Sequence, residues 1–229
     1  MRALLSALQI ALLSIPTLAV NRPLAGWENS SKLTQLRLLS QAGFHVPISL
    51  VTTRPSDLMR FQQSVPAVIY KSASGQRSIV ELLGDAALLR LPTLTYCPVL
   101  FQEAISGPDV RVHVVGSNVY CVRIESDRID YRYAASRGGA RYLSRFEHLP
   151  SELAERCVRF AAGRGLNMAG FDFKIAESGE YYCLEMNPSP AFEFFDRCLG
   201  GEICNAVVRL LTGEKVVAPG ARPSTERID

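Results

Sequence analysis

The feature that most constrains the fold of this chain is an alternating stretch, GFDFKIAESGEYYCLEMNP, at residues 170–188. Apolar and polar residues alternate on both sides of the segment ESG, which is the pattern of two half-buried strands. If Ser178-Gly179 is a two-residue loop, the strands form a hairpin in which Asp172 lies directly opposite Glu185. Opposed carboxylates on a sheet repel each other, so this pair requires either solvent or a cation between its members.

Strict alternation places Cys183, Glu185 and Asn187 on one face of the second strand and Met186 on the other. Carboxylate and amide oxygens are ligands that Mg²⁺ accepts in proteins. The hairpin alone leaves two interpretations open. Either Asp172 and its neighbours on this face form a metal site, or the face is solvated and carries two ordinary acids.

Composition and charge limit the possible functions. The chain has 229 residues, enough for one large domain or two small ones. A formal net charge of +3 with scattered arginines does not indicate nucleic-acid binding. None of the six cysteines forms a CxxC pair or fits a zinc spacing. We therefore expect buried, reduced thiols, for example at Cys157 and Cys183, and a reducing compartment.

The N-terminal segment, MRALLSALQIALLSIPTLAV, permits two interpretations. An arginine followed by an apolar stretch fits a signal peptide. Leu4, Leu8, Leu12 and Ile15 recur at helical spacing, however, and polar residues interrupt the stretch. This pattern favours an amphipathic helix docked on the core, and the segment is too interrupted for a membrane span. We therefore predict a protein without membrane contacts.

The remaining pattern of helices and strands is mixed. Helices are expected at residues 29–43, 55–63, 149–165 and 195–213, and strands outside the hairpin at 46–52, 67–71, 78–83, 99–105, 110–116 and 118–124. This order predicts an α+β fold with largely antiparallel sheets in two lobes. The expected parts are an N-terminal helical segment at 1–28, lobes at 29–95 and 96–215, and a disordered tail at 216–229.

Two short segments have the composition of a nucleotide site. Lys71 ends a predicted strand before the loop SASGQRS, and a lysine followed by backbone amides suits phosphates. A surface lysine is the alternative. Gln102 and Glu103 lie where an apolar strand becomes polar, and we expect an exposed strand edge there that hydrogen-bonds a planar base.

Arginines mark two further segments. Asp109 and Arg111 share one face of a predicted strand, where a surface salt bridge is the alternative to a functional role. Arg132 and Arg137 precede paired glycines in DYRYAASRGG, which suits an anion-binding loop, although structural arginines are common.

In this order along the chain, NRPLAGWENSSKLTQL, VIYKSASGQRSIV, FQEAISGPDVRVHVVG, DYRYAASRGG and GFDFKIAESGEYYCLEMNPSP together resemble an ATP-grasp domain of the RimK-like ligase type. The likeness extends from about Asn21 to about Leu211. Its most specific piece is the Asp…Glu-x-Asn-Pro hairpin, and each shorter motif alone is weak. The resemblance implies two α+β lobes that clasp ATP between them.

Carried over motif by motif, the resemblance implies a role for residues of each segment. Lysines would contact the phosphates, the segment around Glu103 would bind the adenine edge, and Asp109 would lie by the ribose. The implied nucleotide-binding residues are Lys32, Lys71, Gln102, Glu103, Ala104, Ile105, Asp109, Arg132 and Tyr133. The implied catalytic residues, at the phosphates or the acyl-phosphate intermediate, are Arg111 and Arg132. The implied ligands of Mg²⁺ or Mn²⁺ are Asp172, Glu185 and Asn187.

The reaction implied by the resemblance is ATP-dependent joining of a carboxylate to an amine. The carboxylate attacks the γ-phosphate to give an acyl phosphate, and the amine then displaces phosphate to form an amide or peptide bond. The implied partners are ATP, a carboxylate substrate and an amine acceptor, which is an amino acid, a peptide or a protein tail. A cytoplasmic location accompanies this chemistry.

Two features depart from the family's pattern. Relatives usually carry a separate N-terminal domain, whereas only a short segment precedes Lys32 here. A second copy of the chain or a partner protein would then complete the substrate site. The loop after Arg132 has Ala134 where the family often has asparagine. The alternative function is therefore a catalytically inactive ATP-binding module that assists a complete enzyme.

Overall fold

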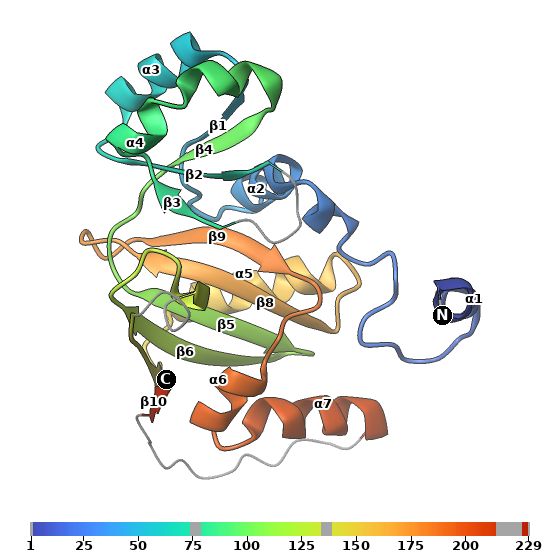
Figure 1. Cartoon of the computed structure of the whole chain (residues 1–229). Coiled ribbons are helices and arrows are strands. Elements are labelled where there is room, and N and C mark those ends of the chain that lie inside the picture. The colour runs from blue at the N-terminus through green and yellow to red at the C-terminus, as the bar shows by residue number, and fades with distance from the viewer. Residues whose placement is uncertain (1, 74–78, 134–138, 214–225, 229) are drawn as a thin grey trace.

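The computed structural model describes residues 2–73, 79–133, 139–213 and 226–228, which form two antiparallel sheets with helices around them (Figure 1). The smaller sheet has the strand order β1-β4-β2-β3, and the larger has the order β10-β7-β6-β5-β8-β9. The α+β class with antiparallel sheets, predicted from the sequence, is confirmed.

The elements have the following bounds. The strands are β1 (Ser49–Thr52), β2 (Val68–Ser72), β3 (Glu81–Leu82), β4 (Val99–Glu103), β5 (Asp109–Val115), β6 (Asn118–Ser126), β7 (Arg141–Arg145), β8 (Met168–Ile175), β9 (Tyr181–Asn187) and β10 (Glu226–Ile228). The helices are α1 (Arg2–Ser14), α2 (Lys32–Gln41), α3 (Pro55–Ser64), α4 (Asp85–Leu88), α5 (Ser151–Ala162), α6 (Glu193–Cys198) and α7 (Glu202–Thr212). Short 3₁₀ helices occur at Trp27–Ser30, Leu91–Tyr96 and Tyr131–Tyr133.

The β8–β9 hairpin reaches its predicted register in an unexpected way. Its loop has three residues, 177–179, because the amide of Ala176 donates to the carbonyl of Glu180 (2.8 Å). A three-residue loop alone would shift every pair by one position. A β-bulge beyond Phe173 shifts the pairs back, so that Asp172 does lie opposite Glu185.

The bulge also changes which side chains face the core. Cys183 and Met186 are both fully buried, whereas Leu184 and Glu185 between them line a pocket. The prediction that Cys183 shares the face of Glu185 is therefore wrong, because the bulge interrupts the strict alternation of β9. Cys157 is buried as expected, and none of the six cysteines, all of which lie in the described part of the chain, forms a disulfide.

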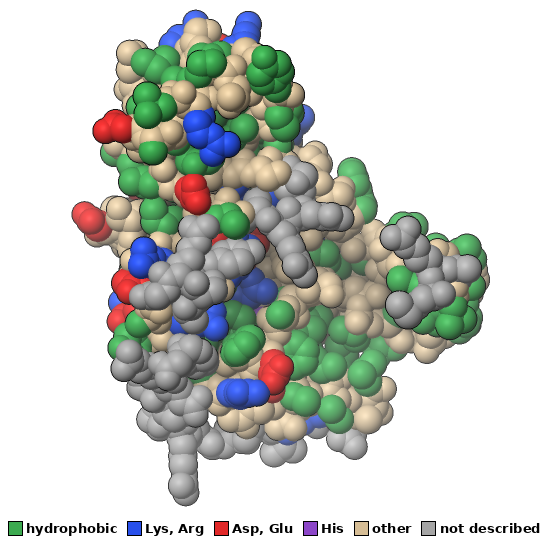
Figure 2. Space-filling model, in the orientation of Figure 1, with side chains coloured by type: hydrophobic (Ala, Val, Ile, Leu, Met, Phe, Trp, Pro, Cys, Tyr) green, Lys and Arg blue, Asp and Glu red, His purple; other side chains and the backbone are tan. Residues whose placement is uncertain are grey.

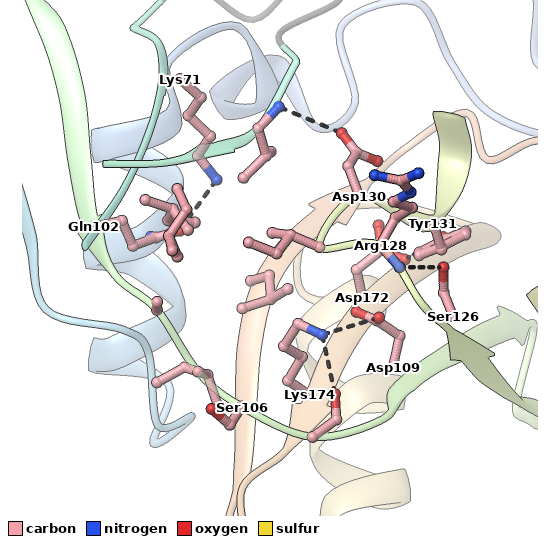
Figure 3. Close-up of a pocket in the computed structure, with 18 of the residues that line it drawn as sticks. Lys71, Gln102, Ser106, Asp109, Ser126, Arg128, Asp130, Tyr131, Asp172 and Lys174 are labelled. Atoms are coloured by element: carbon pink, nitrogen blue, oxygen red, sulfur yellow. Dashed lines mark hydrogen bonds and ion pairs between the residues drawn. The ribbon is translucent and has the colours of Figure 1, made fainter. Parts of the chain in front are cut away.

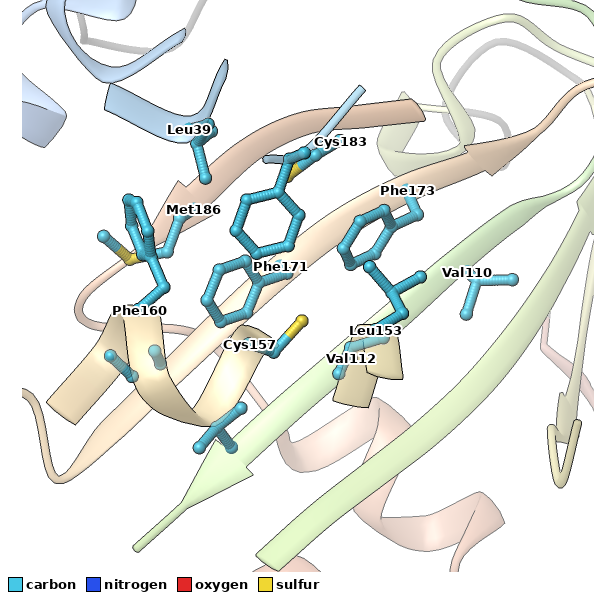
Figure 4. Close-up of a cluster of buried hydrophobic side chains, with 14 of the residues drawn as sticks. Leu39, Val110, Val112, Leu153, Cys157, Phe160, Phe171, Phe173, Cys183 and Met186 are labelled. Atoms are coloured by element: carbon cyan, nitrogen blue, oxygen red, sulfur yellow. The ribbon is translucent and has the colours of Figure 1, made fainter. Parts of the chain in front are cut away.

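The larger sheet is covered on both faces. On one face, Phe171 and Phe173 of β8 pack against Cys157 and Phe160 of α5 (Figure 4). On the other face, residues of α6 and α7 form a second apolar cluster with β5, β6 and β7. Because both faces are covered, every residue of β5 is buried. This includes Arg111, which alternation alone would place on a solvent-exposed face.

Helix α1 stands apart from the two sheets (Figure 1), and hydrophobic side chains gather on it in the space-filling view (Figure 2). Leu4 is 76% exposed and Ile10 65%. Arg22 holds the end of this segment by donating to the carbonyls of Ile15 (3.1 Å) and Thr17 (2.7 Å). The predicted docking of this helix on the core is therefore wrong. Among the described residues, no helix combines the length and the apolar character that a membrane crossing requires.

In the described part of the chain, two segments cross between the larger and the smaller sheet, at residues 42–48 and 104–108. Helix α2 packs on the larger sheet, because the side chain of Gln35 donates to the carbonyl of Met186 (2.6 Å) and accepts from its amide (3.0 Å). β4, which follows the proposed boundary at residue 96, pairs with β1 and β2. We therefore propose a smaller lobe of residues 49–103. Of the tail expected to be disordered, the structure describes only Glu226–Ile228, which form β10.

Gly107 allows the crossing segment 104–108 to lie directly against β8. Its φ is +119°, and a Cβ built there would be 2.0 Å from the carbonyl oxygen of Ile175. We expect Gly107→Ala to lower the free energy of unfolding by about 3 kcal/mol, measured by urea denaturation. Gly179→Ala is the matched control, since Gly179 has φ +85° but no atom within 4 Å of such a Cβ. It should cost only about 1 kcal/mol, and equal losses would contradict the role of close approach.

Candidate functional site

A pocket of about 390 Å³ lies between the two sheets (Figure 3). Strands β2, β3 and β4 of the smaller sheet form one wall, and β5, β8 and β9 of the larger sheet form the other. The crossing segment 104–107 closes one end, and residues 126–132 border the larger sheet. This volume is in the range of pockets that bind small molecules and cofactors.

The structure brings most of the predicted site residues together in this pocket. The predicted residues that line it are Lys32, Lys71, Gln102, Glu103, Ala104, Ile105, Asp109, Arg132, Asp172 and Glu185. Arg111 and Asn187 are not among its lining residues, and the side chain of Tyr133 lies outside the described part of the chain. The roles of these residues stay predictions.

Asp172 is the centre of a buried polar cluster. Its Oδ2 atom accepts a hydrogen bond from Nη1 of Arg111 (2.6 Å), and its Oδ1 atom accepts one from the hydroxyl of Tyr131 (3.4 Å). Burial, the largest single effect, lowers the pKa of the Arg111 guanidinium, but Asp172, Tyr131 and Glu185 together outweigh it, so that the pKa is raised. Arg111 thus does not line the pocket itself but contacts Asp172, which does.

Glu185 faces the same pocket from the next strand. Nζ of Lys32, the first residue of α2, lies 3.6 Å from Oε2 of Glu185. Asn187 instead uses Oδ1 to accept from the amide of Ser189 (2.9 Å). Among the described residues there is no group of three or more His, Cys, Asp or Glu side chains placed to hold a metal ion. Two carboxylates beside a nucleotide-sized pocket nevertheless fit Mg²⁺, which commonly takes one or two carboxylates and completes its shell with phosphates and water.

Lys71 is buried at the opposite wall. Its Nζ atom donates to Oε1 of Gln102 (3.1 Å), whose own amide nitrogen donates to the hydroxyl of Ser49 (2.9 Å). Burial, followed by the charge of nearby Lys32, lowers the pKa of Lys71 to about 8. The side chain of Gln102 thus orients Lys71, whereas the sequence analysis predicted Gln102 beside the adenine base.

The strand edge expected at Gln102 and Glu103 is not exposed, because β4 is paired on both sides. The amide of Glu103 donates to the carbonyl of Ile48 (2.8 Å), and the amide of Ala104 donates to that of Ala67 (2.9 Å). Ile105 follows, lines the pocket and has an amide without a hydrogen-bond partner in the described part of the chain. In the described residues of this segment, the first backbone amide available to a ligand is therefore that of Ile105, two residues after the predicted Glu103.

Asp109 is held at the end of the crossing segment by a lysine that sequence reasoning did not identify. Nζ of Lys174 donates to Oδ2 of Asp109 (3.0 Å) and to the carbonyl of Gly107 (3.0 Å). Burial raises the pKa of Asp109 to about 6, although Lys174 opposes this shift. Lys174 could have been identified in the sequence, since it lies two residues after Asp172 and therefore on the same face of the predicted strand.

Asp130 is a second residue that sequence reasoning did not identify. Its two carboxylate oxygens accept from Nε (2.8 Å) and Nη2 (2.8 Å) of Arg132, and this pairing raises the pKa of the guanidinium. Its Oδ2 atom also accepts from the amide of Val80 (3.4 Å), a residue on the side of the smaller sheet. Asp130 therefore orients Arg132 and connects the two walls of the pocket.

Two antiparallel sheets with a pocket between them, which both lysines and acids line, are the arrangement of an ATP-grasp ligase. A family model described as the RimK-like ATP-grasp domain matches residues 29–211. The chain belongs to the RimK-like ATP-grasp family, and with it to the ATP-dependent ligases that form carbon–nitrogen bonds.

Individual relatives agree with this assignment. A probable alpha-L-glutamate ligase of Aliivibrio fischeri (strain MJ11) is 26% identical over 216 residues, which cover 87% of this chain and 68% of that protein. The ATP-grasp ligase PsnB, solved with a phosphomimetic variant of its minimal precursor, Mg and ADP, is 33% identical, with a TM-score of 0.77 over 91% of this chain and 67% of that one. A RiPP-associated ATP-grasp ligase of Chryseobacterium gregarium, at 23% identity and a TM-score of 0.79 over 92% of this chain and 68% of that one, supports the fold alone.

Proposed function

We propose that this chain uses Mg·ATP to activate a carboxylate as an acyl phosphate and then joins it to an amine. The observation that carries the proposal is the position of Asp172 opposite Glu185 in the pocket that also contains Lys32 and Lys71. In such a site the two carboxylates would bind a metal ion, and the metal ion and the two lysines would balance the negative charge of a polyphosphate.

The described residues support one orientation of the nucleotide. In the described part of the chain the amide of Ile105 has no hydrogen-bond partner and would donate to the adenine edge, and Asp109, which also lines the pocket, would lie by the ribose. Lys71, and Lys32 beside Glu185, would hold the phosphates. Asp172 and Glu185 would hold Mg²⁺ or Mn²⁺, which when bound neutralises phosphate charge.

The substrates follow from the same reasoning at a coarser level. The named relatives include a probable alpha-L-glutamate ligase and a ligase complexed with its precursor, which supports an amino acid or a peptide as one substrate here. No side-chain nucleophile is required, since the carboxylate attacks the γ-phosphate directly and the amine displaces phosphate from the acyl phosphate. The site contributes positioning and charge neutralisation. ATP chemistry, together with six cysteines that form no disulfide in the described part of the chain, supports a cytoplasmic location.

The proposal is tested first by calorimetry with Mg·ATP and then by ADP release in the presence of candidate carboxylates and amines. Metal-dependent nucleotide binding followed by carboxylate-dependent ADP release supports a ligase. Binding without ADP release for any substrate supports the alternative, an inactive ATP-binding module that assists a complete enzyme. A folded chain that does not bind Mg·ATP would contradict both functions, and binding restored by a second copy or a partner protein would show that the site is completed from outside.

The affinity for Mg·ATP should fall as the pH rises above about 8, by up to about tenfold per pH unit. Burial lowers the pKa of Lys71 to about 8, so the free protein loses this positive charge in the range where most lysines keep it. Lys71→Arg keeps its charge at every pH used and should remove this dependence. Calorimetry between about pH 7 and about pH 9.5 measures the effect. An unchanged affinity in the original protein would show that Lys71 does not contact the phosphates.

A further inference from the structure

The carboxylate of Asp172 is held at both of its oxygens. Nη1 of Arg111 donates to Oδ2 (2.6 Å), and the hydroxyl of Tyr131 donates to Oδ1 (3.4 Å). The side chain of Arg111 is only 6% exposed, so water and salt screen its positive charge weakly. This charge repels any second cation that approaches Oδ2. A metal ion in the pocket is therefore restricted to Oδ1 as its ligand atom on Asp172.

Tyr131 is kept in place by contacts that do not involve Asp172. Its ring packs against the second apolar cluster, between the larger sheet and the helices α6 and α7. Its backbone carbonyl accepts from Nη1 of Arg141 (3.3 Å). The guanidinium of Arg141 in turn lies over the ring of Phe194, 5.4 Å from the ring centroid. The hydroxyl of Tyr131 thus approaches Oδ1 of Asp172 from a fixed position, on a residue that also lines the pocket.

Glu185, the other proposed metal ligand, is held more loosely. Its side chain is 30% exposed, and its ion pair with Lys32 joins atoms 3.6 Å apart. Glu185 can therefore adjust its position, whereas Asp172 presents one oxygen in one direction. Mg²⁺ requires near-ideal octahedral geometry, whereas Ca²⁺ accepts variable geometry and binds carboxylates through one oxygen or through both. A carboxylate with one available oxygen of fixed direction consequently favours Mg²⁺.

We propose that Tyr131 is a positioning residue that makes the proposed metal site selective for Mg²⁺ over Ca²⁺. Its hydroxyl fixes the direction of Oδ1, and Arg111 prevents Asp172 from binding a metal ion through both oxygens. At 3.4 Å the hydrogen bond from Tyr131 is long, and contacts of this kind often tighten when a site binds its ligands. This inference rests on the proposed function and adds to it the residue that determines the choice of metal.

The test is calorimetry of ADP binding to the full chain in three solutions, with excess Mg²⁺, with excess Ca²⁺ and with EDTA. The original chain should bind Mg·ADP at least about tenfold more tightly than Ca·ADP. Tyr131→Phe removes the hydroxyl and keeps the ring. It should weaken the binding of Mg·ADP by about 10–100-fold, the range for hydrogen-bond partners of metal ligands. The binding of Ca·ADP should weaken by less than about threefold, because Ca²⁺ tolerates a change in ligand direction.

Tyr70→Phe is the matched control. Tyr70 lies on β2, and its hydroxyl donates to Oε2 of Glu81 (2.7 Å), so this variant also removes a hydrogen bond between a phenol and a carboxylate. Neither of these residues is among those that line the pocket. The affinity for ADP should stay within about twofold of the original in all three solutions, as expected for a change away from the site. Urea denaturation checks that each variant is folded.

The outcomes separate this inference from the proposed function. An original chain that binds ADP no more tightly with Mg²⁺ than with EDTA would overturn the proposed metal site, and this inference with it. An original chain that prefers Mg²⁺ to EDTA but binds Ca·ADP as tightly as Mg·ADP would overturn the selectivity alone, without any variant. So would a Tyr131→Phe variant that weakens Mg·ADP and Ca·ADP equally, or neither. Weaker binding of metal-free ADP by this variant would show that the hydroxyl contacts the phosphates instead of positioning Asp172.

Discussion

Replacing Asp172 with asparagine should lower the free energy of unfolding by about 3–5 kcal/mol, as expected when one partner of a buried ion pair is removed. The Arg111 guanidinium lies 2.6 Å from the charge that is lost, and its side chain is only 6% exposed. Water therefore cannot replace the carboxylate. Urea denaturation followed by circular dichroism at neutral pH measures the loss.

The double variant Asp172→Asn/Arg111→Met is the control for this prediction. It removes both charges and should recover most of the stability, because no unpaired ion then remains in the interior. A double variant as unstable as the single one would show that shape, rather than charge, holds this part of β5 and β8 together. Any loss of activity in an Asp172 variant must therefore be compared with its stability before it is attributed to the metal.

Glu185→Gln should reduce Mg²⁺-dependent ADP release by about 10²–10⁴-fold, because a bound metal contributes several kcal/mol of charge stabilisation in the transition state. Its effect on folding should be small. The side chain of Glu185 is 30% exposed, and its contact with Lys32 is a 3.6 Å ion pair near the surface. The measurement is initial velocity as a function of Mg²⁺ concentration at saturating ATP, beginning with the substrates that release ADP in the original chain.

Glu180→Gln is the matched control for Glu185→Gln. Glu180 precedes β9, and its half-exposed side chain lies beside His45 instead of in the pocket. This change should leave both turnover and the Mg²⁺ dependence unaltered. A Glu185→Gln variant with normal turnover and normal Mg²⁺ dependence would remove this residue from the proposed metal site.

The pairing of Asp172 with Glu185 could be predicted from sequence because alternation identifies a hairpin and its turn residues. The loop and the bulge could not, since each shifts the register by one residue and the two shifts cancel. The burial of Cys183 was predicted for the right reason, its apolar surroundings, but on the wrong face. A local pattern of alternating residues contains no information about the extra residue of a bulge, here Leu184 on β9.

The parts that sequence reasoning missed depend on contacts between distant segments. The central position of β4 follows from its pairing with β1 and β2, which no local pattern encodes. β7 was not predicted, and therefore neither was the position of Arg141 above Phe194. The apolar spacing of α1 correctly predicted a helix but not its place, because apolar residues at helical spacing do not specify what covers them.

The two chain crossings between the sheets are anchored at the same end of the β8–β9 hairpin. His45, in the first crossing, accepts from the amide of Cys183 through its carbonyl (2.8 Å), and Gly107, in the second, accepts from Lys174 (3.0 Å). Two adjacent tethers restrict the lobes to rotation about one axis, whereas a single tether would allow twisting as well. Asp172 and Glu185 lie farther along the hairpin from this axis. We therefore expect any closure of the lobes to give small displacements near the crossing segments, where the adenine is proposed to bind, and larger displacements near Asp172 and Glu185, where the phosphates are proposed to bind.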